Sequence, residues 1–181
     1  MVPPPLPAGR SAATEKRRRA LDGGGPGRDM RGMDRPFWKT TPLEAMTETQ
    51  WESLCDGCGK CCVVKLEDED TKELAYTRLH CRLFDGSSCQ CSDYVNRRKH
   101  VPDCVQLTPE IVRTVDWLPR TCAYLLVHEG KDLPGWHHLI CGDRQRIHDT
   151  GHSIRGRTVS EDTVFEEDEI DWVIDWEGTE P

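Results

Sequence analysis

The sequence has no long hydrophobic run. None of its 181 residues lie in a stretch approaching the ~20 consecutive apolar residues that a transmembrane helix needs. The N-terminus carries Pro3-Pro4-Pro5 and no continuous apolar segment, so it does not resemble a secretory signal. We therefore expect a cytoplasmic protein that binds no membrane. In that reducing compartment, cysteines serve as metal ligands or redox groups rather than disulfides.

The familiar catalytic motifs are also absent. The chain contains no G-x-S-x-G, no phosphate-binding loop, no H-E-x-x-H and no dinucleotide fingerprint. Carboxylates are plentiful, but no pair of them stands out from the acidic background. The sequence thus predicts no catalytic residue and leaves open whether the protein is an enzyme.

Positive charge is scarce outside the N-terminus. Residues 1–32 hold seven Lys/Arg against three Asp/Glu, a net charge of +4, whereas residues 33–181 hold 17 against 29, a net charge of −12. An acidic body repels phosphates, so we expect no nucleic acid partner. Apolar residues make up only 36% of the chain, which predicts a small core to which bound metal would add stability.

The composition divides the chain into three parts. Residues 1–32 are rich in Pro, Gly, Arg and Ala and are expected to be a disordered extension, either a true flexible tail or the product of a misassigned start. Residues 33–160 form the cysteine-bearing domain. Residues 161–181 form an acidic tail with ten Asp/Glu and no Lys/Arg. Trp172 and Trp176 in this tail predict that it docks on the domain or on a protein partner.

A helix is predicted immediately before the densest group of cysteines. Thr47 and Gln50 have the spacing of a capping box, and Trp51 and Leu54 follow on one face. The helix leads directly to Cys55.

Further elements indicate an α+β fold. Strand-like residues on both sides of an acidic, solvated turn at 67–70 predict a β-hairpin over residues 62–84, which returns Cys81 toward the first cysteines. Helices are expected from Thr108 and from Thr121, and a short strand over residues 154–159. We therefore predict a small, irregular α+β domain with short helices and a β-hairpin, crosslinked by cysteine-bound metal.

Four thiols lie within eight residues, in the pattern C-x-x-C-x-x-C-C formed by Cys55, Cys58, Cys61 and Cys62. C-x-x-C-x-x-C supplies three ligands to a bacterial four-iron cluster, and C-x-x-C is half of many zinc sites. A disulfide would need an oxidising compartment, and a thiol–disulfide exchange pair would need a βαβ context. Both are weaker interpretations than metal binding.

The supply of thiols exceeds one metal site. One four-coordinate ion takes four thiolates and two take eight, whereas the chain has ten cysteines. Neighbouring side chains tend to diverge, so we expect Cys62 to face a second centre or the core, or to serve a polynuclear cluster from another side. Cys122 is either a ligand or a core residue, and Cys141 is the weakest candidate. The remaining candidate ligands are Cys81, Cys89, Cys91 and Cys104, with His80 and His100 as substitutes. His137 and His138, beside Trp136, are expected at the surface or in a turn rather than as ligands.

Several ordered blocks resemble one bacterial family. The block from Trp51 to Cys62, WESLCDGCGKCC, resembles the opening of the YcgN-type cysteine-cluster proteins, which are grouped with a zinc- or iron-chelating C-x-x-C-x-x-C-C domain and have no assigned activity. The resemblance runs from about Phe37 to about Trp176, and residues 1–32 have no counterpart. It places the family's nine cysteines on Cys55, Cys58, Cys61, Cys62, Cys81, Cys89, Cys91, Cys104 and Cys122. The other similar blocks are residues 65–71, Cys89-Gln90-Cys91, Pro102-Asp103-Cys104, Trp117-Leu118-Pro119, residues 121–124 and residues 129–134.

The sequence therefore predicts a protein that holds zinc or iron, including iron in an iron–sulfur cluster, through these cysteines. One alternative is a redox enzyme, or an accessory to one, in which a cluster carries electrons. Another is an interaction module in which zinc is purely structural and the acidic tail contacts a partner.

Overall fold

The computed structural model describes residues 35–179, so the expectation for residues 1–32 lies outside the described part of the chain. Short helices and small sheets confirm the α+β class. The α-helices are α1 (Phe37–Thr40), α2 (Glu48–Leu54), α3 (Arg97–His100), α4 (Pro109–Thr114), α5 (Ala123–His128), α6 (His138–Cys141) and α7 (Arg146–Asp149). The strands are β1 (Val63–Glu67), β2 (Leu74–His80), β3 (Phe84–Asp85), β4 (Gln90–Cys91) and β5 (Val159–Ser160). The 3-10 helices are η1 (Leu43–Ala45), η2 (Lys60–Cys62), η3 (Glu161–Thr163) and η4 (Glu166–Trp172).

Helix α2 begins at the predicted capping box. The Thr47 hydroxyl accepts from the Gln50 amide at 3.3 Å, and the Gln50 side chain accepts from the Thr47 amide at 2.9 Å. Leu54, at the other end, is fully buried. The cap fixes where the helix starts. The burial of Leu54 anchors its C-terminal end, which Cys55 follows directly.

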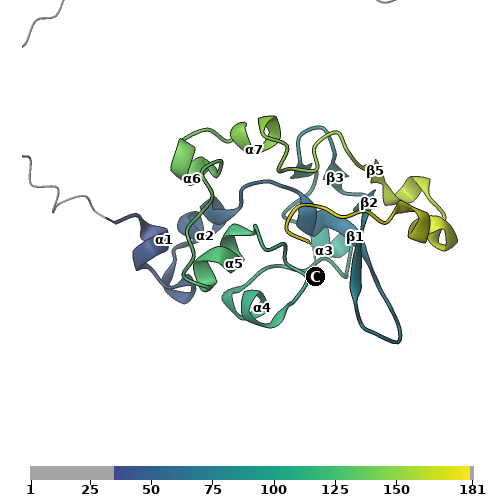
Figure 1. The fold of residues 1–181 in the computed structure, drawn as a ribbon, viewed down its shortest axis with the longest axis horizontal. Helices are drawn as coiled ribbons and strands as arrows, with labels where there is room; N and C mark the ends of the chain where they lie inside the picture. The colour runs from purple at the N-terminus through teal and green to yellow at the C-terminus, as the bar shows by residue number, and fades with distance from the viewer. Residues whose placement is uncertain (1–34, 180–181) are drawn as a thin grey trace, which may run out of the picture. The chain divides into compact units, whose positions relative to one another are not determined.

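Helices α2 and α5 pack against each other. The rings of Trp51 and Tyr124 lie 4.6 Å apart, and the Tyr124 hydroxyl donates to the Trp51 carbonyl at 3.1 Å. Helix α4, capped by Thr108 as predicted, packs beside α5. These helices lie on one side of the domain (Figure 1) around a first apolar core that contains Leu43, Leu54, Val112, Leu118, Ala123, Tyr124 and Leu133.

The predicted hairpin is present as the antiparallel pair β1–β2. Its register places Val63 opposite His80 and Glu67 opposite Leu74, with an irregularity near Val63. Strand β5 extends this sheet in parallel beside β2, and β3 pairs with β4 in a separate two-stranded sheet. The strand predicted over residues 154–159 is shorter than expected. Ile154 is instead fully buried in the loop before β5, where it packs in a second core.

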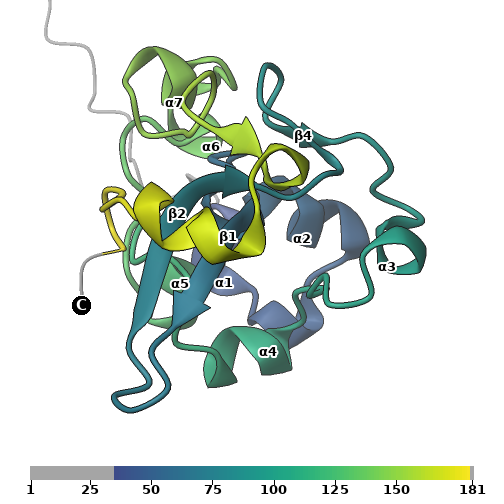
Figure 2. The ribbon, with the colours of Figure 1, turned by 90° about the vertical axis from the view of Figure 1, so that its right-hand side faces the viewer.

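The acidic tail docks on its own domain. The Ile174 amide donates to the Tyr76 carbonyl at 2.8 Å, and Trp176 is buried, donating its indole N–H to the Thr77 carbonyl at 3.0 Å. The Arg157 guanidinium lies 4.6 Å from the centre of the Trp176 ring. Figure 2 shows this C-terminal segment crossing in front of β1 and β2. Trp176 thereby completes the second core, with Val63, Tyr76, Phe84, Cys89 and Ile154.

Across residues 35–179, no helix combines the length and apolar character needed to cross a membrane.

Candidate metal centre

The loop from Cys55 to Cys62 is held by backbone contacts at several points. The Cys58 amide donates to the Asp56 carboxylate at 2.9 Å, and the Cys58 carbonyl accepts from the Ile154 amide at 2.9 Å. Lys60 is almost fully buried, and its ammonium donates to the Glu177 carbonyl at 2.5 Å. The C-terminal segment is therefore hydrogen-bonded to the cysteine loop through Lys60.

Gly59 is required by both conformation and space. Its φ of +80° lies in the left-handed region, as does the +78° of Gly57. A Cβ atom on Gly59 would lie 2.7 Å from both Ile154 Cγ1 and Phe84 Cζ, whereas one on Gly57 would meet nothing within 4 Å. The loop therefore turns tightly against the second core at Gly59.

The packing of α2 on α5 brings a distant cysteine to this loop. Cys55 ends α2, and Cys122 is the N-cap of α5. The charge of Cys61 raises the pKa of both these thiols, and Cys122 also raises the pKa of Cys55, although desolvation is the larger cause in each. We call Cys55, Cys58, Cys61 and Cys122 the helix-side set.

The four thiols of the helix-side set differ in their exposure to solvent. The side chains of Cys55 and Cys61 are exposed, and those of Cys58 and Cys122 are half-buried. Protein atoms nevertheless surround these thiols, and the resulting desolvation raises the pKa of Cys122 to about 12 and that of Cys58 well above its usual value. The set is therefore reachable from solvent and enclosed on its protein side.

A second group of cysteines meets near the start of the hairpin. The Cys81 amide donates to the Cys62 carbonyl at 2.9 Å, and the Phe84 amide donates to the Cys81 carbonyl at 2.7 Å. Phe84 pairs with Cys91 across β3–β4. As predicted, the hairpin thus returns Cys81 to the cysteine block. We call Cys62, Cys81, Cys91 and Cys104 the sheet-side set.

The two sets meet at Cys61 and Cys62. Their Sγ atoms lie 3.9 Å apart, so these neighbouring side chains touch rather than diverge, which corrects the expectation from sequence. The Cys62 thiol, within hydrogen-bonding distance, and the nearby Lys65 ammonium together lower the pKa of Cys61 to about 7, although desolvation acts in the opposite direction. Cys61 is thereby the most readily ionised thiol of the block.

Cys89 and Cys141 belong to neither set, although Cys62 and Cys81 pack against the second core, which contains Cys89. Cys89 is buried in the second core, and desolvation raises its pKa to about 11, with Arg155, Ser153 and Asp85 as the groups that modify the shift. Cys141 is exposed at the end of α6. All ten cysteines fall within the described residues and all are free thiols, so none forms a disulfide.

The predicted substitute ligands have other partners. His80 Nδ1 lies 2.9 Å from the Thr158 hydroxyl, and His100 Nε2 lies 3.3 Å from an Asp93 carboxylate oxygen. His137 lies in a bend just before α6, in line with the expected turn, but its side chain is fully buried and not at the surface. Its Nε2 faces the Leu54 carbonyl at 3.0 Å, and its Nδ1 accepts from the Leu139 amide at 3.1 Å.

This pattern fixes His137 as the neutral tautomer with the proton on Nε2, since a carbonyl can only accept. Desolvation accordingly lowers the pKa of His137. The imidazole ties α6 to the end of α2, one residue before Cys55. No hydrophobic periodicity in the sequence predicted that His137 would be buried between α6 and the end of α2.

The donor chemistry of the helix-side set fits zinc or iron. Thiolates are soft ligands that both metals accept, and a set of four satisfies a tetrahedral ion or the corners of a four-iron cluster. Within residues 35–179, no three Cys, His, Asp or Glu side chains are already arranged to hold one ion. Metal binding at this set therefore requires thiol side chains to rotate about χ1 and lose their protons.

Comparison with known proteins agrees with this chemistry. Residues 54–123 match the CxxCxxCC family, described as "Putative zinc- or iron-chelating domain". A UPF0260 protein of Sinorhizobium fredii is 56% identical over 151 residues, covering 82% of this chain and 97% of the relative. One from Caulobacter is 51% identical over 158 residues, covering 81% and 98%. No solved structure matches the chain. The chain belongs to the UPF0260 family.

Proposed function

We propose that this protein is a cytoplasmic iron–sulfur protein whose cluster is held by Cys55, Cys58, Cys61 and Cys122. The observation that supports the proposal is the packing of α2 on α5, because Cys55 ends the first helix and Cys122 is the N-cap of the second. In this proposal the four soft donors would come from two helix ends and one glycine-bearing loop of the same chain.

Spacing favours iron over zinc. Three cysteines at intervals of three residues are the run that supplies three ligands to bacterial four-iron clusters, with a fourth from elsewhere in the chain. Structural zinc sites more often combine two C-x-x-C pairs. The helix-side set has the first arrangement, with Cys122 as the remote ligand.

A redox accessory role is a second candidate. Cys55 and Cys61 are exposed, so a cluster held by this set would lie close to solvent and to any docking electron donor or acceptor. The Lys65 ammonium, which lies near Cys61, would moderate the negative charge of the thiolates. When bound, the cluster would supply one-electron chemistry.

The test is anaerobic purification of the full chain, followed by iron, sulfide and zinc analysis and a visible spectrum. We expect brown protein with broad absorption near ~400 nm and matched iron and sulfide, as for a cysteine-ligated cluster. Colourless protein with stoichiometric zinc would reject the cluster and retain metal chelation. Well-folded protein that holds neither metal would reject both.

A further inference from the structure

We propose that Cys62, Cys81, Cys91 and Cys104 bind a second, separate polynuclear iron–sulfur cluster in the cavity that they line. This inference rests on the proposed function for its type of chemistry but concerns different residues. The chain would then carry two centres side by side, one in each thiol set.

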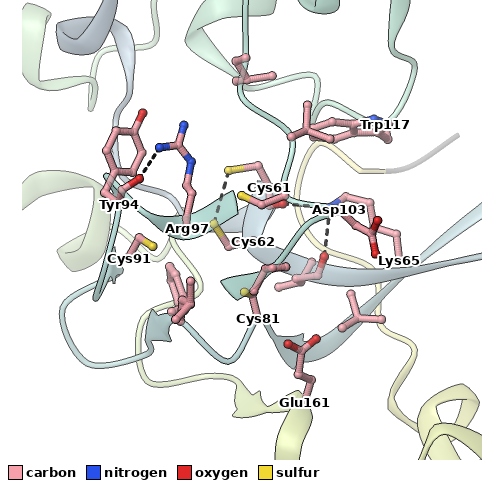
Figure 3. A pocket seen from close by; sticks show the side chains of 18 of the residues that line it. Cys61, Cys62, Lys65, Cys81, Cys91, Tyr94, Arg97, Asp103, Trp117 and Glu161 are labelled. Atoms are coloured by element: carbon pink, nitrogen blue, oxygen red, sulfur yellow. Dashed lines mark hydrogen bonds between the residues drawn. The ribbon is translucent and has the colours of Figure 1, made fainter. Parts of the chain in front are cut away.

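The cavity lined by these thiols is the main structural support for the second centre. It has a volume of about 470 Å³, and its walls include all four thiols of the sheet-side set together with Cys61. Figure 3 shows Cys62, Cys81 and Cys91 around the same space, on the first cysteine block, the end of the hairpin and β4. Cys104 approaches from a separate loop, where its amide donates to the Val101 carbonyl at 3.0 Å. Four segments of the chain thus line one cavity.

The size of this cavity distinguishes a mononuclear zinc site from a polynuclear cluster. Zinc–thiolate bonds are about 2.3 Å, so the four sulfur atoms of a zinc site stand within about 4 Å of one another and enclose no free space. The four sheet-side thiols instead line a cavity of about 470 Å³ together with other side chains. A polynuclear cluster has iron and sulfide atoms of its own to fill the space between the thiolates.

The backbone around the thiols is well fixed. Cys62 and Cys81 are joined by an amide–carbonyl hydrogen bond, and Cys91 is held by its pairing with Phe84. Phe84 is itself buried in the second core. Three of the four ligands are therefore positioned by the folded sheet, and binding would need only side-chain adjustment.

Two cations line the cavity beside the thiols. Lys65 and Arg97 are matched there in number by the carboxylates of Asp103 and Glu161, of which Glu161 also pairs with Arg82 at 3.2 Å. The Lys65 ammonium is 3.0 Å from the Val63 carbonyl and 4.9 Å from the centre of the Trp117 ring, so it is held beside the thiols. Cluster thiolates carry net negative charge, and fixed cations nearby stabilise it.

The boundary between the centres runs between Cys61 and Cys62. Both lie in η2, and their Sγ atoms are 3.9 Å apart. Cys61 also lines the cavity, so it is the thiol at which the two sets adjoin. We assign Cys61 to the helix-side centre and Cys62, whose carbonyl accepts from the Cys81 amide, to the sheet-side centre.

The experiment compares iron and sulfide per chain in full-length protein purified anaerobically. The variants are Cys58→Ser in the helix-side set, Cys81→Ser and Cys104→Ser in the sheet-side set, and Cys141→Ser as the control. We expect each sheet-side variant and Cys58→Ser to keep about half of the wild-type iron, and Cys141→Ser to keep all of it. Circular dichroism confirms folding, and Cys91→Ser replaces any sheet-side variant that does not fold.

The outcomes separate the two proposals. If the sheet-side variants keep full iron while Cys58→Ser loses it, the second centre is rejected and the proposed function stands. If Cys58→Ser alone keeps full iron, the helix-side assignment fails and the sheet-side centre stands. If every folded variant in either set loses all iron, the thiols form a single site and the separation is overturned. Zinc bound at the sheet-side set in place of iron would overturn the polynuclear centre.

Discussion

Single residues decide how the cysteine loop is shaped, and Gly59 is the clearest case. We predict that Gly59→Ala lowers the free energy of unfolding by about 3 kcal/mol, combining the left-handed backbone strain with overpacking against Ile154 and Phe84. Gly57→Ala has the same strain but open space, so it should cost about 1–2 kcal/mol. Urea denaturation of both variants measures the difference. Equal losses would show that the close approach at Gly59 is unimportant.

The buried His137 predicts a dependence on pH. Its folded pKa is lowered, so between that value and the unfolded pKa of about 6.5 the unfolded chain binds more protons, and stability falls as pH decreases. Desolvation lowers the pKa of the neighbouring His138 to about 4, so this residue adds in the same direction. We expect a loss between pH 7 and pH 5, at most about 1.4 kcal/mol per unit of pH for each histidine.

Urea midpoints measured from pH 7 to pH 5 test this effect. The slope should flatten in the His137→Gln, His138→Gln double variant, and it should persist in a His128→Gln control, because His128 is exposed. If the double variant loses stability as steeply as the wild type, other groups account for the slope.

At the residue scale, the sequence indicated candidate thiol ligands but not where each of them lies in the fold. The spacing of Cys55, Cys58 and Cys61 is local and is therefore readable from the sequence. The assignment of Cys122 depends on a contact between two helices, and the burial of His137 depends on its hydrogen bonds to Leu54 and Leu139. Such long-range contacts leave no local signal.

Elements with strong local signals were predicted well. The capping box located the start of α2, and Thr108-Pro109 located α4, because caps act within one turn. The short strand after Ile154 was predicted too long, because Ile154 is buried as a loop residue packed on Gly59 and not as part of a sheet. The tail was expected to dock, and only the structure identifies β2 as the place.

The docking of the tail gives a prediction for an element. Trp176 is buried in the second core, so Trp176→Ala should lower the free energy of unfolding by about 3–5 kcal/mol. Trp172 is only half-buried in η4, and we expect Trp172→Ala to cost clearly less. Urea denaturation monitored by circular dichroism compares the two variants. A small effect of Trp176→Ala would mean that the tail contributes little to the folded domain.

For the whole molecule, metal is expected to reinforce the packing that already holds α2 against α5. The helix-side set joins α2, the loop and α5, so binding energy there is also folding energy. We predict that anaerobic removal of metal lowers the free energy of unfolding by more than about 3 kcal/mol. Urea titrations of protein before and after chelation test this, with re-addition of metal as the control. An unchanged midpoint would contradict a structural role for the metal.

The most direct test of the helix-side assignment compares Cys122→Ser with Cys89→Ala. Both cysteines belong to the nine positions indicated by the family resemblance, but only Cys122 lies with Cys55 and Cys61, whereas Cys89 lies in the second core. We predict that folded Cys122→Ser protein loses the helix-side metal, and that Cys89→Ala keeps the wild-type metal content. Full metal content in Cys122→Ser, or its loss in Cys89→Ala alone, would contradict the assignment.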